Sequence, residues 1–241
     1  MSTFVDLLPQ ELGSSAEESP VVVTRPEESS VRSAPWSLES FAEQQIHGLV
    51  RQLFFPSSAP VRQVVFSAVD LETEVLPICQ QVGETLGQQA SGTVCVVEAI
   101  PPKQKYGIVP EPGLLASSPA KRLGALRDSA EQLSSGLWFM PADVFCGGNH
   151  DFSTLWLRAR LAELRLEFDY TVLEGPAAAH SEAAALGGLS DGLVLVLQAN
   201  FTRRVTAQKA KERLSAAKAH LLGTILTGRT FPIPQALYKR L

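Results

Sequence analysis

Short apolar runs alternate with helix-like segments along most of this chain. The runs are typical of buried strands, and they fall at residues 64–66, 93–97, 137–140, 170–174, 193–198 and 221–227. The segments between them repeat apolar residues with a helical period, and they fall at residues 37–53, 78–86, 120–133, 151–166, 180–187 and 202–217. Strands that are apolar throughout and alternate with helices are typical of a parallel sheet covered on both faces. The sequence therefore predicts an α/β fold with a mostly parallel β-sheet flanked by helices on both faces.

Charge divides the chain into two parts. Residues 1–35 are rich in Ser, Glu and Pro and carry six acids and two arginines, whereas residues 36–241 carry nineteen charges of each sign. We predict a flexible acidic tail over 1–35, because such a segment buries too little apolar surface to offset its ordering entropy. The alternative is that residues 21–23, three valines, dock as a short strand. We expect residues 36–241 to form a single domain, whose neutral balance gives no basic footprint for nucleic acid.

Several classes of site find no support in the sequence. The three cysteines lie far apart, the four histidines are scattered, and no Cys-x-x-Cys spacing occurs, so we expect no metal site. The amino-terminal residues lack the basic and apolar regions of a signal peptide. No apolar run is long enough to span a bilayer, which takes about 18 residues. These features predict a cytoplasmic protein.

Two carboxylates end predicted strands. Glu98 follows the second strand, and Glu174 ends the strand at 170–174. The first strand leads into Ser67 and Ala68. In a parallel sheet these ends meet at one edge, where ligands of α/β proteins bind.

In order and spacing, a set of segments resembles the cytoplasmic domain of the bacterial tyrosine autokinases of capsule and exopolysaccharide synthesis, which are MinD/ParA-like P-loop ATPases. The strongest similarity is in the carboxyl-terminal half, at residues 161–164, 168–170, 174–176, 189–192, 202–204 and 222–226. The resemblance implies a P-loop NTPase fold, with ATP and Mg²⁺ held by the loop after Ser67 and Ala68. It also implies that Glu98 and Glu174 stand where the family has the aspartates of its second and Walker B motifs.

The departures from the family fall on the phosphate-binding loop. Val69, Leu71 and Thr73 stand where the family has glycines, although a phosphate cradle needs backbone that approaches closely at positive φ. Glu74 stands in the place of the loop lysine, and Val75 in that of a hydroxyl that would hold Mg²⁺. We therefore assign no catalytic residue, expect no cofactor and predict a relic nucleotide site formed by Ser67, Ala68, Glu74, Val75, Glu98 and Glu174.

The family's ring-forming motif is also altered. Glu43 matches it, but Ile46 and Leu49 replace its two arginines. We expect these two apolar side chains to be exposed on the monomer and to form, with Glu43, a different interface. The family's terminal tyrosine cluster is reduced to Tyr238.

These observations favour a non-catalytic relative of the exopolysaccharide tyrosine kinases that acts as a cytoplasmic interaction or regulatory subunit. By resemblance, its partner would be a membrane chain-length-determinant or adaptor protein, or an active kinase paralogue, and it would be recruited to the inner membrane by that partner. A homo-oligomer is a further possibility. Two alternatives stay open: an active kinase or ATPase that binds ATP and Mg²⁺ in an unconventional way, and a degenerate MinD/ParA-type positioning protein.

Overall fold

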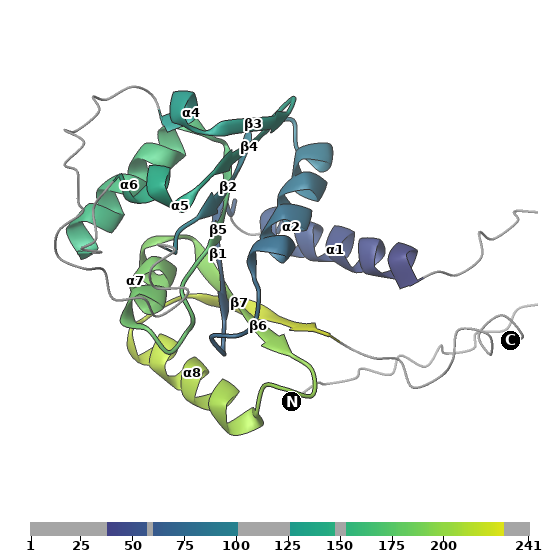
Figure 1. Ribbon diagram of the computed structural model, residues 1–241, viewed down its shortest axis with the longest axis vertical. Coiled ribbons are helices and arrows are strands. Elements are labelled where there is room, and N and C mark those ends of the chain that lie inside the picture. The colour runs from purple at the N-terminus through teal and green to yellow at the C-terminus, as the bar shows by residue number, and fades with distance from the viewer. Residues whose placement is uncertain (1–37, 57–59, 101–125, 148–152, 229–241) are drawn as a thin grey trace, which may run out of the picture. The chain divides into compact units, whose positions relative to one another are not determined.

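A seven-stranded sheet forms the centre of the protein, with the strand order β3-β4-β2-β5-β1-β6-β7. The computed structural model describes residues 38–56, 60–100, 126–147 and 153–228 (Figure 1). The strands are β1 (Gln63–Ala68), β2 (Val94–Glu98), β3 (Glu131–Ser134), β4 (Leu137–Met140), β5 (Tyr170–Glu174), β6 (Gly192–Gln198) and β7 (Leu221–Thr227). All neighbouring pairs are parallel except β3 and β4. The prediction of a mostly parallel sheet is confirmed.

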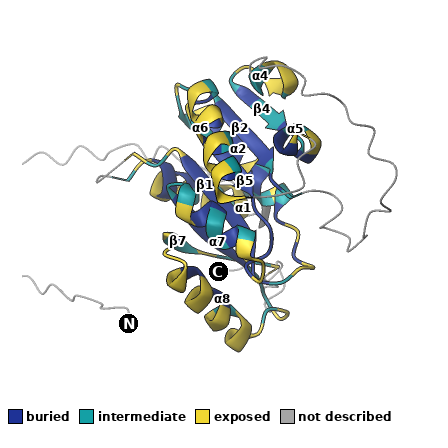
Figure 2. Ribbon diagram, turned by 90° about the vertical axis from the view of Figure 1, so that its left-hand side faces the viewer, coloured by how far each residue is buried: buried dark blue, intermediate teal, exposed yellow. Residues whose placement is uncertain are grey.

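Helices cover both faces of this sheet, also as predicted. They are α1 (Leu38–Phe54), α2 (Leu76–Gln89), α4 (Leu126–Ser129), α5 (Ala142–Cys146), α6 (Thr154–Glu167), α7 (Ser181–Leu189) and α8 (Arg204–Ala216). The core is divided by the sheet, because successive residues of a strand point to opposite faces. Val64 and Phe66 of β1 pack with α1 and α2, whereas Val65 packs with α5 to α8. The central strands between these helices are mostly buried (Figure 2).

Close contact between α2 and the sheet depends on Gly83. A Cβ atom at this position would lie 2.3 Å from Cγ2 of Val96 in β2, so a larger residue would push the helix outward. Glycine lowers helix propensity by about 1 kcal/mol relative to alanine. Here it allows α2 to pack tightly on the central strands.

One predicted helix is wrong in its described part. The helix expected at 120–133 appears only as the single turn α4, and β3 follows it. Pairing of β3 with β4 around Gly136, which has a φ of 98°, overrides the local helical pattern. The short helix α5 was not predicted, although Pro141 before it and the left-handed Gly147 after it are ordinary boundary signals.

The expected exposure of Ile46 and Leu49 is also wrong. Both side chains are half-buried and pack against the core formed by α1, α2 and the sheet. The residues that replace the ring-motif arginines therefore fill a helix–sheet contact, and they no longer support an exposed apolar interface. Glu43 is exposed on the same helix. The predictions for residues 1–35 and for Tyr238 lie outside the described residues.

Candidate functional site

The carboxyl ends of β1, β2 and β5 meet at one edge of the sheet, as the sequence predicts. Glu98 and Glu174 are neighbours in register, and Phe66 of β1 is the other neighbour of Glu174. Only 1% of Glu174 is exposed, so this strand-end carboxylate lies in the protein interior. Glu98 is half-buried, and its Oε2 accepts the backbone N–H of Ala142 at 3.4 Å.

The loop at residues 69–75 follows β1, where the resemblance implies a phosphate-binding loop. None of its residues has a positive φ. Val69 and Val75 are each only 3% exposed and are part of the hydrophobic core, whereas Leu71 at the tip is 70% exposed. The loop is therefore held at both ends by buried valines, and its backbone lacks the left-handed residues that turn successive N–H groups toward an anion.

The amino end of α2, which follows this loop, offers few free amides. Val75 precedes the helix and makes no side-chain cap, and Pro77 in the first turn has no N–H. The N–H groups of Ile78 and Cys79 both donate to the carbonyl oxygen of Val75, at 3.0 and 3.1 Å. Together these features remove most of the backbone donors that a helix start would present to a phosphate.

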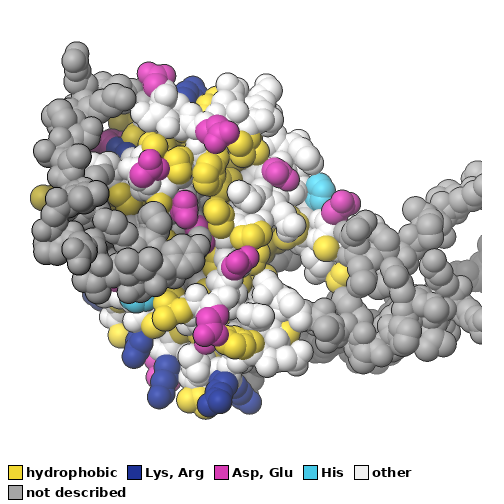
Figure 3. All heavy atoms as spheres, viewed as in Figure 1, with side chains coloured by type: hydrophobic (Ala, Val, Ile, Leu, Met, Phe, Trp, Pro, Cys, Tyr) yellow, Lys and Arg dark blue, Asp and Glu magenta, His cyan; other side chains and the backbone are white. Residues whose placement is uncertain are grey.

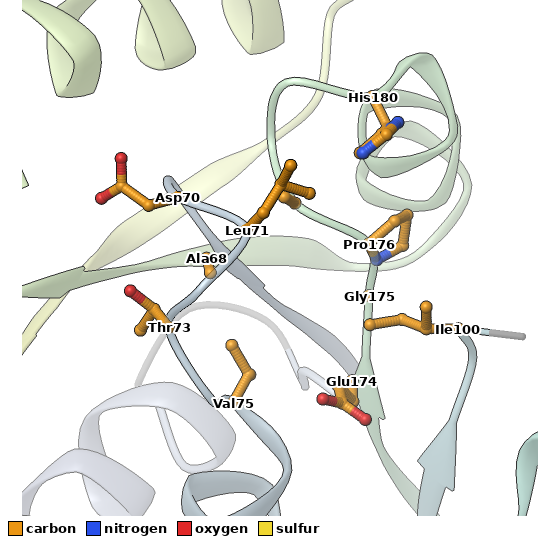
Figure 4. Close-up of a pocket in the computed structure, with 11 residues that line it drawn as sticks. Ala68, Asp70, Leu71, Thr73, Val75, Ile100, Glu174, Gly175, Pro176 and His180 are labelled. Atoms are coloured by element: carbon orange, nitrogen blue, oxygen red, sulfur yellow. The ribbon is translucent and has the colours of Figure 1, made fainter. Parts of the chain in front are cut away.

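A small cavity remains between the loop and β5 (Figure 4). It encloses about 50 Å³, whereas pockets for small ligands commonly hold about 300–1,000 Å³. Of the predicted site residues, Ala68, Val75 and Glu174 line it, together with Asp70, Leu71, Thr73, Ile100, Gly175, Pro176, Ala177 and His180. Ser67 is buried beside it and donates its hydroxyl to the carbonyl oxygen of Pro176. Glu74 is exposed outside the cavity lining.

Hydrogen bonds that the sequence analysis missed tie the loop to the start of α8. The Thr202 hydroxyl donates to Oδ2 of Asp70, and the Gln198 N–H donates to the Thr202 oxygen at 2.9 Å. The Thr73 hydroxyl lies 3.4 Å from Oε1 of Gln198. Two short polar residues in the loop, Asp70 and Thr73, were the only sequence signal for these contacts. They hold the loop in place from its polar side, as the buried valines hold it from the core.

Two aspartates of the family-like segments, Asp169 and Asp191, lie at the amino ends of the strands, opposite the candidate site. Both have structural roles. Oδ2 of Asp191 accepts the N–H groups of Arg62 and Gln63, each at 2.8 Å, and its Oδ1 pairs with Arg165 at 2.7 Å. Burial raises the pKa of Asp191, but these hydrogen bonds outweigh it and hold the pKa below its usual value. Asp169 accepts the N–H of Thr93 at 2.8 Å, which likewise lowers its pKa.

The described part of the chain holds no reactive cysteine and no cluster of metal ligands. Cys79, Cys95 and Cys146 are buried, and burial raises the pKa of Cys146 to about 11. A thiol with that pKa stays protonated at neutral pH, so it is a poor nucleophile. Within the described ranges, no three His, Cys, Asp or Glu side chains converge as a metal site would require, and no helix is long and apolar enough to cross a bilayer.

The strand order and the carboxyl-end site define the class of this fold, that of the MinD/ParA-like P-loop NTPases. A MinD cell division protein from Aquifex aeolicus superposes with a TM-score of 0.51 and 14% identity, over 75% of this chain and 73% of the other. The chimerical protein CapA2B2 gives a TM-score of 0.57 at 18% identity, over 81% and 87% of the two chains. The BceF tyrosine kinase domain gives 0.55 at 18% identity, over 77% and 76%.

Part of the sequence is similar to a bacterial tyrosine kinase. A stretch of 78 residues is 35% identical to the tyrosine-protein kinase YwqD of Bacillus subtilis (strain 168). That stretch covers 32% of this chain and 33% of the kinase. No family model matches the sequence. The predicted resemblance is confirmed, while activity and partners are matters for proposal.

Proposed function

We propose that this protein is a non-catalytic relative of the exopolysaccharide tyrosine kinases and acts as an interaction or regulatory subunit. The observation that carries the proposal is the loop at 69–75, which has no positive φ and is fixed by buried Val69 and Val75. A phosphate would need this loop to turn its amides inward, and that movement would pull both valines out of the core. Burying one such side chain is worth about 1.5–3 kcal/mol.

Charge opposes nucleotide at the same place. Asp70, Glu72 and Glu74 lie in the loop where the resemblance implies a lysine. A unit charge about 4 Å from a phosphate oxygen contributes about 4 kcal/mol at an effective dielectric of about 20. A carboxylate in place of the lysine therefore turns a large electrostatic attraction for the phosphate into a repulsion. Val75 offers no oxygen to Mg²⁺.

The partner class follows from the resemblance and belongs to the same proposal. We expect the protein to bind a membrane chain-length-determinant or adaptor protein, or an active kinase paralogue, and to reach the inner membrane from the cytoplasm through that partner. Relatedness to the kinases supports this expectation.

Calorimetric titration with ATP and ADP in the presence of Mg²⁺ tests the proposal. We expect no saturable heat at millimolar nucleotide and no shift in melting temperature. A tyrosine kinase assay with labelled ATP, with and without the full-length chain, should show no added phosphotyrosine. A micromolar dissociation constant would overturn the proposal and favour the active enzyme. Binding without phosphotransfer would favour the MinD/ParA-type alternative.

A further inference from the structure

β7 is the last strand of the sheet, and among the described residues no strand pairs with its outer edge. Its hydrogen-bond pattern shows which groups face outward. The N–H of Ala199 donates to the carbonyl oxygen of Thr227 at 2.8 Å, and the strand pairs with β6 in unbroken register from Gly223 to Thr227. Because a parallel ladder alternates between its two sides, the N–H and C=O groups of Thr224 and Leu226 point away from β6.

Most of this outer edge lacks the features that usually prevent strand addition. β7 has seven residues, Leu221–Thr227, none of which is charged or proline, and its register shift against β6 lies at its start, before the regularly paired residues 223–227. The opposite edge strand β3 has four residues, includes Glu131 and shifts its register against β4. Short length, charge and irregular pairing protect edges, whereas a long uncharged edge accepts another strand. Leu226 on β7 is 53% exposed.

A basic flank lies beside this edge. α8 packs over β7 and carries four basic residues and one glutamate, a net charge of +3 (Figures 1 and 3). Arg213 points toward the α7 side, since its guanidinium approaches the Ala179 carbonyl at 3.5 Å. Lys211 lies two residues away, about 200° around the helix. Arg204, seven residues before Lys211, shares its direction. These two cations therefore line the outer flank of α8, on the side of the free edge.

We propose that the outer edge of β7 binds an extended acidic segment of a partner protein as an additional strand. Backbone groups of that segment pair with Thr224 and Leu226, and its apolar side chains cover Leu226. Carboxylates on the same face pair with Arg204 and Lys211. Strand addition supplies affinity through the backbone, and side chains supply the choice of partner. The proposal rests on the proposed function only in treating the protein as an interaction subunit.

Charge argues for an acidic partner rather than a second copy. Antiparallel pairing of two β7 edges around a two-fold axis would bring two α8 helices side by side on one face, each with a net charge of +3. Like charges at close range oppose such a dimer. A segment rich in Glu and Val has the opposite charge and a strong preference for extended structure.

The binding test uses a fluorescent peptide of sequence EEVTVTVEE as the probe for the full-length protein. We expect saturable anisotropy that weakens as salt increases. In hydrogen exchange, the amides of Thr224 and Leu226 should gain protection. The same peptide N-methylated at alternate residues should fail to bind, because it cannot complete a ladder. Arg204→Glu with Lys211→Glu should weaken binding by more than about tenfold.

Matched variants distinguish binding at the β7 edge from a general effect of charge or stability on peptide binding. Lys209→Glu changes the same charge on the same helix, but at a position about 200° around the helix from Lys211, and should bind the probe normally. Leu226→Pro removes an outward N–H without removing a bond to β6, and should abolish binding at an unchanged melting temperature; if it misfolds, the N-methylated peptide still decides the question.

Equal binding of the methylated peptide, or equal losses for Lys209→Glu and Lys211→Glu, would overturn the proposal. Concentration-dependent dimers that Leu226→Pro disrupts would assign the edge to a second copy. Binding that appears only after deletion of residues 1–35 would assign it to this chain's own tail. Either of these results would also overturn the proposed partner, while the nucleotide titration tests the non-catalytic role separately.

Discussion

The guanidinium of Arg165 lies 2.7 Å from Oδ1 of Asp191, and this pair joins α6 to the amino ends of β1 and β6. The other oxygen of Asp191 accepts two backbone N–H groups, so one carboxylate fixes three segments. Arg165 also donates to Oε1 of the buried Gln63, at 2.7 Å. The acidic residue of a family-like motif thus stabilises the end of the sheet opposite the candidate site.

We expect Asp191→Ala to lower the free energy of unfolding by about 2 kcal/mol, because it leaves the N–H of Gln63 and the Arg165 guanidinium without their acceptor. Asp191→Asn keeps one oxygen and should cost less. Urea unfolding followed by circular dichroism measures both. Glu163→Gln is the control, since Glu163 forms only an exposed i,i+3 pair with Arg160 and should change stability by less than about 0.5 kcal/mol. Equal effects of the alanine and control variants would contradict this role.

Acid should remove the same stabilisation. The folded-state pKa values of Asp191 and Asp169 lie below their ordinary values. Their contribution is therefore present above the unfolded-state pKa, about 3.9, and is lost as pH falls through the folded-state pKa. Melting temperatures from neutral pH downward should show the gap between the native protein and Asp191→Asn narrowing below about pH 4. A gap that stays constant through this range would show that the carboxylate charge contributes nothing.

Glu74→Lys should restore the cation of the phosphate-binding loop without restoring nucleotide binding. Glu74 is exposed, so the melting temperature should stay within a few degrees. Backbone geometry and Pro77 still prevent the loop from presenting its amides. Calorimetry with ATP and Mg²⁺ on this variant separates charge from geometry: saturable binding would mean that charge alone excludes nucleotide.

Ile46→Arg combined with Leu49→Arg should destabilise the protein, contrary to the expectation from sequence. Both side chains pack on the core between α1 and the sheet. In the same contact, the rings of Phe54 in α1 and Tyr170 in β5 meet edge to face, with their centroids 6.0 Å apart. Placing two cations there should cost about 2–4 kcal/mol. Gln45→Arg, on the exposed side of the same helix, is the control. Thermal unfolding of the native protein, the double variant and Gln45→Arg measures this cost. If the double variant keeps the native melting temperature, the two side chains do not contribute to the core.

Deletion of residues 1–35 should leave the melting temperature within a few degrees. Their composition and net charge of −4 predict a tail that contributes little to the core. Differential scanning calorimetry of the shortened chain is the measurement. A large fall in melting temperature would mean that residues 21–23 dock as a strand.

The sequence alone predicted the mostly parallel sheet and the residues that stand at the carboxyl ends of its strands. Strands such as β5 and β7 were predicted with their observed bounds, because each is a short, mostly apolar run between two helical segments. The sequence likewise shows the strand-end carboxylates Glu98 and Glu174. It also shows that the loop at 69–75 contains neither glycine nor lysine. These features depend on side-chain type at a known place in a known order.

Only the tertiary structure decided burial and pairing. Ile46 and Leu49 were expected on the surface, yet α1 turns them toward the core, since a helix's orientation depends on what it packs against. The segment before β4 forms a strand because β4 is there to pair with it. Glu174 is buried because the neighbouring strands, the loop and Pro176 close over it, and the role of Asp191 comes from segments 128 and 26 residues away. Long-range contacts of this kind leave no local pattern in the chain, so sequence predicts the elements and their order while packing decides which residues face water.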